Sequence, residues 1–184
     1  MSDIRFTLFD TPLGRCGLVW GPAGLRGVHL SDADETATRR QLLRRFPDAV
    51  AGDAPNWVER AISAIQALLG GAAEPLEDVP LDLAGVGDFD RKVYALTRAI
   101  PPGRTLTYGA VAARLGQPGA AREVGQSLGR NPWPIVVPCH RVLGAGGRLV
   151  GFSAPGGTAT KRRMLAIENA RTGDEPTLFD VAGP

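Results

Sequence analysis

Residues 107–142 read TYGAVAARLGQPGAAREVGQSLGRNPWPIVVPCHRV and contain the clearest structural signals of the chain. Two short segments with helical spacing, about 108–115 and 119–128, are separated by a Gly-Gln-Pro sequence at 116–118, which predicts two helices joined by a tight turn. Such a pair is typical of a helix-turn-helix, although a helical hairpin packed inside a core would have the same pattern.

The helical pair ends at an apolar run, PIVV (134–137), that predicts a short buried strand, with GGRLVGF (146–152) as its partner. TATKRRMLAIENA (158–170) follows and predicts a last helix opened by a Thr cap. Upstream, GDFDRKVYALTRAI (87–100) predicts a helix that Asp88 caps and that ends before two prolines.

The N-terminal part has a different pattern. Short β-type runs at 4–9, 16–20 and 25–30 are separated by Pro and Gly turns, which predicts an antiparallel meander, and helical spacing follows at 36–46 and 56–71. The sequence GGAAEPLEDVP (70–80) then indicates a domain boundary. We therefore expect an α+β protein with a small three-stranded antiparallel sheet and its helices in domain 1–80, a mostly helical domain at 81–170, and a disordered tail at 171–184.

Positive charge is concentrated in the second of these domains. Residues 1–80 have 8 basic and 11 acidic side chains, whereas residues 81–170 have 12 basic and 5 acidic ones, although the whole chain is only +2. A basic domain favours a polyanionic partner such as nucleic acid, while a solvated surface remains an alternative. Without a long apolar run for a signal peptide or a membrane span, we expect a cytoplasmic protein that does not bind membranes.

The sequence PCHR (138–141) places a cysteine next to a histidine, which could belong to a metal site or to a thiol nucleophile. Zinc usually takes four ligands, and only Cys16, Cys139, His29 and His140 are available without carboxylates, so we expect neither a metal nor a cofactor. A cysteine nucleophile would need a base, which His140 could supply with Glu168 to orient it. Neighbouring residues of a strand point to opposite faces, so a water would have to bridge Cys139 and His140. An inert buried thiol is an equal alternative.

The same stretch resembles a known family. TYGAVAARLGQPGAAREVGQSLGRNPWPIVVPCHRV, followed by GF, GG, K and IEN, is similar to the catalytic domain of the methylated-DNA-protein-cysteine methyltransferases, over about residues 88–170. The resemblance implies DNA repair by irreversible transfer of an alkyl group to Cys139, without turnover. The group would come from the position-six oxygen of alkylguanine, or the position-four oxygen of alkylthymine, in duplex DNA after base flipping from the minor groove.

The resemblance also implies a role for each matching residue. The second domain would be a DNA-binding and catalytic domain with a helix-turn-helix, and Cys139 would be the acceptor. His140 would deprotonate it through a water, Glu168 would hold His140, Asn131 would brace the segment and Tyr108 would assist departure of guanine. Arg122 would replace the flipped nucleotide in the base stack. The remaining candidates are the DNA-binding residues Thr107, Ala121, Gln126 and Arg130 and the substrate-pocket residues Tyr108, Val142, Phe152, Ser153 and Pro134.

One loop departs from the family pattern. Where many members have Tyr-Ser-Gly-Gly, this chain has FSAPGG (152–157), so Phe152 replaces a tyrosine and Ala154 and Pro155 are extra. We expect methylguanine to remain a substrate and any altered preference to appear for bulky groups. Two other functions stay open: a noncatalytic binder of alkylated DNA, against which Cys139 counts, and a cysteine hydrolase, for which no signature is present.

The tail contains DEPTLFD (174–180), whose Leu178-Phe179 pair resembles short peptides that dock on the bacterial sliding clamp. TLFD also occurs at 7–10, in a predicted strand, so chance recurrence is the competing explanation. Apart from duplex DNA with alkylated guanine and this hypothetical clamp, we expect no partner and a monomer when the protein is free.

Overall fold

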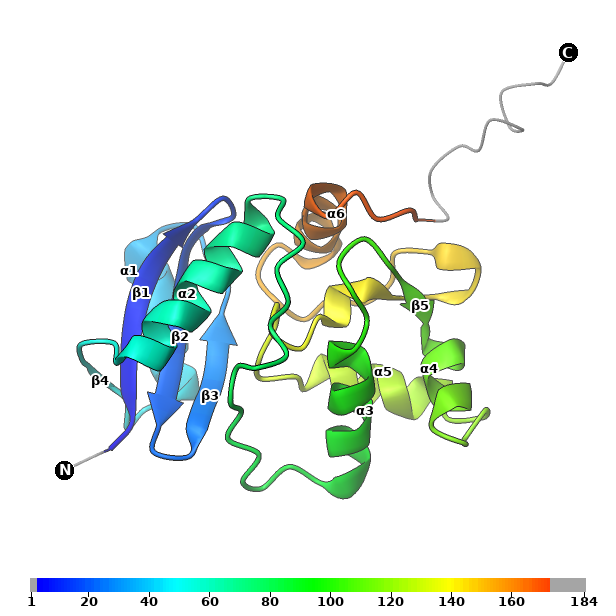
Figure 1. Ribbon diagram of the computed structural model, residues 1–184, viewed down its shortest axis with the longest axis horizontal. Coiled ribbons are helices and arrows are strands. Elements are labelled where there is room, and N and C mark those ends of the chain that lie inside the picture. Colours follow the sequence, from blue (N-terminus) through cyan, green and yellow to red (C-terminus); the bar gives the residue numbers. More distant parts are fainter. Residues whose placement is uncertain (1–2, 173–184) are drawn as a thin grey trace, which may run out of the picture.

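The computed structural model describes residues 3–172 and begins with a sheet held between two helices (Figure 1). Strands β1 (Arg5–Thr11), β2 (Gly14–Gly21) and β3 (Gly24–His29) form the predicted antiparallel meander. A fourth strand that the sequence pattern did not predict, β4 (Val50–Ala51), pairs parallel with β1, so the order is β3-β2-β1-β4. Helices α1 (Glu35–Arg45) and α2 (Asn56–Leu69) cover opposite faces of this sheet.

The alternation of side chains along the strands explains this two-sided packing. Phe6 and Val19 point to one face and pack with Leu42 of α1. Their neighbours of opposite parity, among them Leu18, point to the other face and share a core with Ile65 of α2. Because successive strand residues face opposite sides, both faces of the sheet are apolar and each needs a helix to cover it.

The C-terminal part is mostly helical, as its sequence predicts. Its helices are α3 (Asp88–Arg98), α4 (Tyr108–Arg114), α5 (Ala121–Gly129) and α6 (Gly157–Ile167), with 3-10 turns at Cys139–Arg141 and Ala145–Gly147. Two short parallel strands, β5 (Leu106–Thr107) and β6 (Val142–Leu143), pair with each other. No helix within residues 3–172 combines the length and apolar character that crossing a membrane requires.

Three local predictions for this part are wrong. PIVV (134–137) forms turns rather than a strand, so Cys139 lies in a 3-10 turn and not at a strand end, and GGRLVGF (146–152) has no strand to pair with. Asp88 was predicted to cap helix α3, but it is the first residue of that helix, and Gly87 occupies the cap position without a side-chain hydrogen bond. Helix α6 is capped by Gly156, whose φ of 80° and close approach to the Thr160 hydroxyl leave no space for a Cβ.

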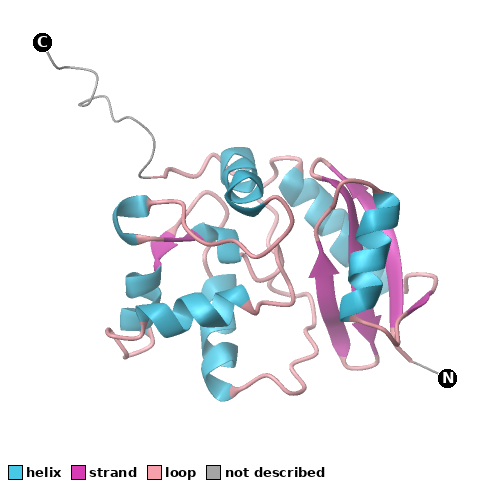
Figure 2. Cartoon of the chain, turned by 180° about the vertical axis from the view of Figure 1, so that it is seen from behind, coloured by secondary structure: helices cyan, strands magenta, loops and turns pink. Residues whose placement is uncertain are grey.

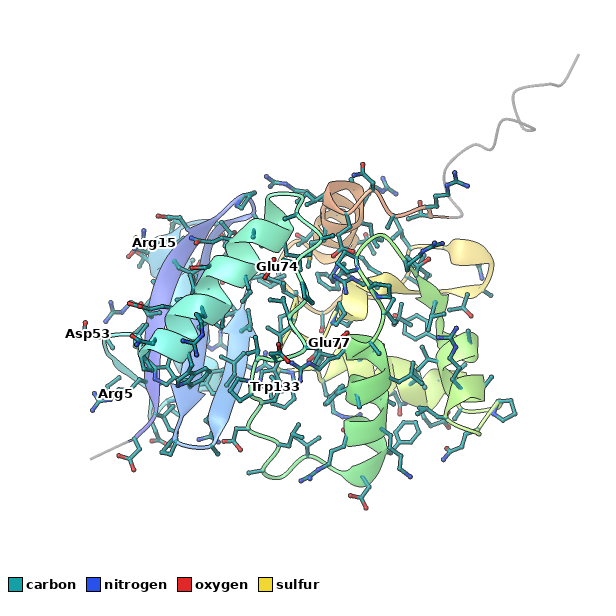
Figure 3. All side chains as sticks on the ribbon, viewed as in Figure 1. Arg5, Arg15, Asp53, Glu74, Glu77 and Trp133 are labelled. Carbon is teal, nitrogen blue, oxygen red and sulfur yellow. The ribbon has the colours of Figure 1, made fainter. Side chains whose placement is uncertain are left out.

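One cluster of buried hydrophobic residues extends from the α2 face of the sheet through the helical part. Trp133 joins the two parts, because its indole nitrogen donates to the Leu25 carbonyl of β3 at 2.7 Å and its ring packs edge-on against Tyr94 of α3. Figure 3 shows Trp133 between the sheet and α3, and Figure 2 shows that the chain between the two parts is largely loop. Residues 80–82 also bond to Leu25, so the segment after the predicted boundary lies along β3.

Candidate active site

The short β5–β6 pairing brings the two ends of segment 107–142 together. Leu106 pairs with Val142 and Thr107 with Leu143. Tyr108 follows β5 directly, and the turn Cys139–Arg141 directly precedes β6. The register of two residue pairs therefore places Tyr108 and Cys139 on the same cavity.

That cavity has a volume of about 270 Å³. Tyr108 begins α4, and its hydroxyl is 3.5 Å from the Val150 carbonyl at the start of the loop that contributes Phe152 and Ser153 to the lining. The hydroxyl of Ser153 donates to the Gly129 carbonyl at 3.0 Å, which ties this loop to the end of α5. The complete lining is Tyr108, Gly125, Leu128, Gly129, Cys139, Gly151, Phe152 and Ser153.

Asn131 holds the turns that lead to Cys139. Its side-chain amide donates to the Val137 carbonyl at 2.8 Å, and its side-chain oxygen accepts from the Trp133 backbone at 2.9 Å. Within this closed loop Ile135 has a φ of 76°, a conformation that a β-branched residue rarely adopts and that the surrounding bonds must hold. These contacts explain why an apolar run with strand propensity forms turns instead.

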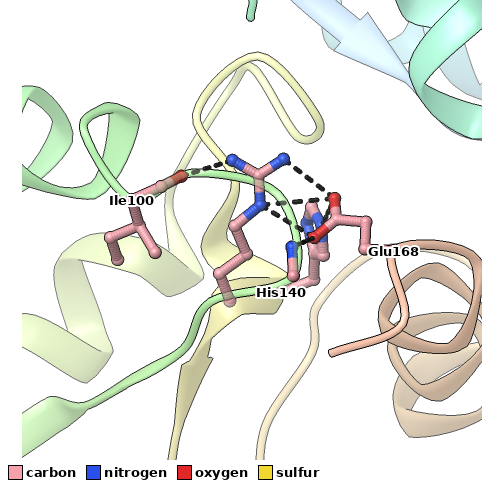
Figure 4. Close-up of polar contacts among 5 residues, drawn as sticks. Ile100, His140 and Glu168 are labelled. Carbon is pink, nitrogen blue, oxygen red and sulfur yellow. Dashed lines mark hydrogen bonds and ion pairs between the residues drawn. The ribbon is translucent and has the colours of Figure 1, made fainter. Parts of the chain in front are cut away.

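The two residues that follow Cys139 form a buried polar group with Glu168 (Figure 4). The Nε2 atom of His140 is 2.9 Å from Oε1 of Glu168, which ends α6. Arg141 donates to both oxygens of the same carboxylate through Nε, and again through Nη2 at 2.8 Å, while Nη1 donates to the Ile100 carbonyl. His140 is fully buried, and the side chains of Arg141 and Glu168 are 6% and 4% exposed.

The second ring nitrogen of His140, Nδ1, is buried without a protein partner, one of four such side-chain atoms among the described residues. Burial lowers the pKa of His140, so the ring is neutral at pH 7. With the Nε2 proton directed at Glu168, Nδ1 has a free lone pair. Burial alone would raise the pKa of Glu168, but the bonds from His140 and Arg141 and the Arg141 charge bring it to about 2.

The Cys139 thiol is protonated in the protein without substrate. The residue retains some exposure, yet burial raises the pKa of its thiol, against the opposing effects of Asn131 and of the Lys161 charge. A thiolate must therefore form when a substrate arrives rather than exist beforehand.

Lys161 is a functional candidate to which the sequence analysis gave no role. Its side chain is fully buried on α6, and Nζ donates to the carbonyls of Val142 and Val150 at 2.7 and 3.1 Å. Burial lowers its pKa to about 8, and Nζ lies 5.7 Å from the centre of the Tyr108 ring. The available signal was a rare lysine on the same helical face as Met164 and Leu165, which are also buried.

Cys139 also borders a second, smaller cavity of about 80 Å³ on the side of the sheet. Pro134, which the sequence analysis assigned to the substrate pocket, lines this cavity and not the larger one, and so do Ala154 and Pro155 of the extended loop. Val142, assigned to the same pocket, lines neither cavity, because its side chain is fully buried in the core. An influence of the extra residues on specificity stays a prediction.

The candidate DNA-binding residues lie at the start of α4, along α5 and at its end. Arg122 and Gln126 are exposed on α5, and Ala121 is its first residue. Thr107 caps α4 by accepting from the Ala110 backbone at 3.1 Å. Arg130, at the end of α5, forms an ion pair with Asp90 of α3 at 3.0 Å. The helix-turn-helix interpretation of this pair stays a prediction, and Leu178 and Phe179 of the hypothetical clamp motif lie outside the described residues.

Comparisons with known proteins agree with this geometry. Residues 88–170 match the family described as 6-O-methylguanine DNA methyltransferase, DNA binding domain. The methylated-DNA-protein-cysteine methyltransferase of Mycobacterium tuberculosis is 36% identical over 177 residues, which cover 96% of this chain and 99% of the relative. The protein of the same name from Methanothermobacter thermautotrophicus is 32% identical over 85% of this chain and 81% of its own length.

Solved structures give the same result. The M. tuberculosis O6-methylguanine methyltransferase has a TM-score of 0.71 at 34% identity and covers 96% of this chain and 99% of its own. The OGT of M. tuberculosis in complex with DNA has a TM-score of 0.70, also at 34% identity, over 92% of this chain and 96% of its own.

Proposed function

The chain belongs to the family of methylated-DNA-protein-cysteine methyltransferases, and we propose that Cys139 is the residue that accepts the alkyl group. The protein is thus a DNA repair enzyme that transfers an alkyl group from alkylguanine to one of its own cysteines. The observation that carries the assignment is the position of Cys139 on the larger cavity, in the same 3-10 turn as His140 and Arg141, which are buried and bond to Glu168. The only other cysteine, Cys16, is fully buried in β2.

The reaction is a displacement at a saturated carbon. The Cys139 sulfur forms a bond to the alkyl carbon, the bond from that carbon to the position-six oxygen breaks, and guanine leaves with the electron pair. His140 Nδ1 takes the thiol proton through a water, and Glu168 stabilises the imidazolium that results. Arg141 fixes the orientation of Glu168 through its three bonds to the carboxylate.

Other lining residues act on the purine. Tyr108 donates a hydrogen bond to the ring and so stabilises the guanine anion as it leaves, and the backbone of Ser153 donates to the reacting oxygen. Asn131 holds the turn that presents Cys139, a role supported by its bonds to Val137 and Trp133. The position-four oxygen of alkylthymine presents similar chemistry and is a second substrate.

The base must leave the duplex to reach this cavity, because a stacked base cannot present its alkyl carbon in line with a protein thiolate. We propose that α4 and α5 act as a helix-turn-helix on the minor groove and that Arg122 fills the gap left by the extruded nucleotide. Thr107, Ala121, Gln126 and Arg130 contact the flanking backbone. Such a protein works beside DNA in the cytoplasm of the cell.

The two competing functions predict different products. A noncatalytic damage binder would bind the alkylated duplex and leave Cys139 unmodified. A cysteine hydrolase would release its product and continue. Incubation with a methylated duplex followed by mass analysis of the peptide that contains Cys139 tests the assignment, and we expect the methyl group on Cys139.

Arg122→Ala is expected to slow repair of a methylated duplex by about 10-fold or more, because the extruded state loses the side chain that stabilises it. The free alkylated base needs no extrusion, so its reaction rate should change by less than about twofold. Single-turnover rates with duplex and free base measure both effects. Arg60→Ala, which removes an exposed arginine from α2, is the matched control and should change neither rate. Equal losses on duplex and free base would show that Arg122 is structural.

A further inference from the structure

The two cavities beside Cys139 divide the space around the reacting carbon. They share Leu128, Cys139, Phe152 and Ser153, so the cysteine and the 152–153 loop form the wall where they meet. The larger one has Tyr108 and accommodates the purine. A substituent on the attacked carbon cannot occupy the space of the purine or of the sulfur in line with it. It must therefore point into the smaller cavity.

One of the residues that line the smaller cavity is a cation, Arg45. Arg45 is the last residue of α1, and its Nη2 lies 3.5 Å from the carbonyl oxygen of Asn131, which lines the same cavity. Its guanidinium carbon is also 5.7 Å from the centre of the Phe46 ring. Among the residues that the structure describes, no carboxylate pairs with Arg45, and one long hydrogen bond leaves most of its donors available.

The remaining charged groups around this cavity do not neutralise Arg45. His29 of β3 lines the cavity too, and its Nε2 atom is already 2.7 Å from Asp32. Asp32 lines an outer hollow together with Arg44 and Arg45, but among the described residues its ion pair is with His29 and not with Arg45. The residues that line the smaller cavity itself include Arg45 and no Asp or Glu, and the nearby Asp32 is already paired with His29.

The volume of the smaller cavity limits the substituent that it can hold. A volume of about 80 Å³ corresponds to two or three water molecules at about 30 Å³ each, which is more than a methyl group needs and enough for a few heavy atoms. A carboxylate has the planar two-oxygen shape to which a guanidinium donates two parallel hydrogen bonds.

We propose that Arg45 makes this protein a repair enzyme for alkylguanine whose alkyl group carries an anionic end, with position-six carboxymethylguanine as the defining substrate. The inference rests on the proposed function of Cys139. The thiolate forms a bond to the methylene carbon, the carbon–oxygen bond breaks, guanine leaves and takes a proton, and the product is S-carboxymethylcysteine. A thiolate that attacks a carbon bearing a carboxylate meets a like charge, and Arg45 offsets that repulsion.

Three duplexes test the proposal, with guanine that carries methyl, carboxymethyl or the neutral carbamoylmethyl group, which has nearly the shape of carboxymethyl. For Arg45→Gln, single-turnover transfer should fall by about 10-fold or more with carboxymethyl, the size expected when a hydrogen bond to a charged group is lost. Transfer from the other two should stay within about twofold. Arg44→Gln, which removes the neighbouring charge in the outer hollow, should leave all three rates unchanged.

Each other outcome has a defined meaning. Equal losses on all three duplexes would show that Arg45 only supports the fold around Asn131, and no loss with carboxymethyl would also overturn the proposal. If Arg45→Gln does not fold, the unaltered protein still decides, because carboxymethyl should then react at least as fast as carbamoylmethyl, and a slower reaction overturns the proposal. Absence of transfer to Cys139 from every duplex would instead refute the proposed function itself.

Discussion

Cys139→Ser is expected to abolish alkyl transfer while leaving binding to an alkylated duplex within about twofold of that of the unaltered protein. The substitution keeps the size of the side chain and removes the nucleophile, because a serine hydroxyl is far less acidic and less nucleophilic than a thiol. From the effect of removing nucleophiles in other enzymes, we expect the rate to fall by roughly 10⁴-fold or more, below detection in a single-turnover assay.

Cys16→Ser is the matched control for that experiment. Cys16 is buried in β2, 3.5 Å from the Thr11 hydroxyl, and lines neither cavity beside Cys139. We therefore expect the control to transfer one alkyl group as the unaltered protein does. Transfer by Cys139→Ser, with the alkyl group found on another residue, would contradict the assignment of Cys139 as the acceptor.

Glu168→Gln is expected to have the second-largest effect, on both stability and rate. The change leaves Arg141 buried without its counter-charge, and breaking a buried pair in this way costs about 3 kcal/mol or more of unfolding free energy. The His140 imidazolium loses its stabilising anion as well, so transfer should slow by about 100-fold, the lower end of what general base catalysis supplies. Urea denaturation and single-turnover rates measure the two effects.

The stability effect should depend on pH in one direction. The pKa of Glu168 is lowered from 4.5 to about 2, so its ionised form favours the folded state above pH 4.5. That contribution, about 3 kcal/mol for a shift of this size, disappears as the pH falls from about 4.5 toward 2. The stability difference between the unaltered protein and Glu168→Gln should shrink over the same window.

Glu59→Gln makes the same chemical change at an exposed carboxylate on α2 and should alter unfolding free energy by less than about 0.5 kcal/mol. If Glu168→Gln behaved like this control in both stability and rate, the buried carboxylate would have no part in proton transfer.

Periodicity was enough to predict the parts of the fold that depend on neighbours in sequence. The meander and the helices α2 and α3 follow from local spacing, and the sequence predicts them with errors of a few residues at their ends. The segment 134–137 fails because its conformation is decided by the Asn131 side chain, which bonds to Val137 across six residues. A run of β-branched residues cannot reveal such a bond, so propensity indicates a strand where the structure has turns.

The residues of the candidate active site could likewise be predicted only in part. Cys139, His140 and Glu168 could be named from their chemistry and from the family resemblance, and the structure brings the last two into contact. Arg45 could not be found, because it is 94 residues from Cys139 in sequence and reaches the cavity only because α1 and β3 contact Asn131 and Trp133. Arg141 was read as part of the PCHR motif without a role, since its partner Glu168 is set by the end of α6.

We expect each protein molecule to be consumed by its own reaction. A product on Cys139 would be a thioether, which has no carbonyl for water to attack, and the other cysteine of the chain is buried in β2 and lines neither cavity beside Cys139. The most direct test mixes the protein with a large molar excess of methylated duplex and counts repaired guanines per chain after the reaction has stopped. We expect one repaired guanine and one methyl group on Cys139 for every active chain, whereas repair of more than one guanine per chain would show that the protein turns over.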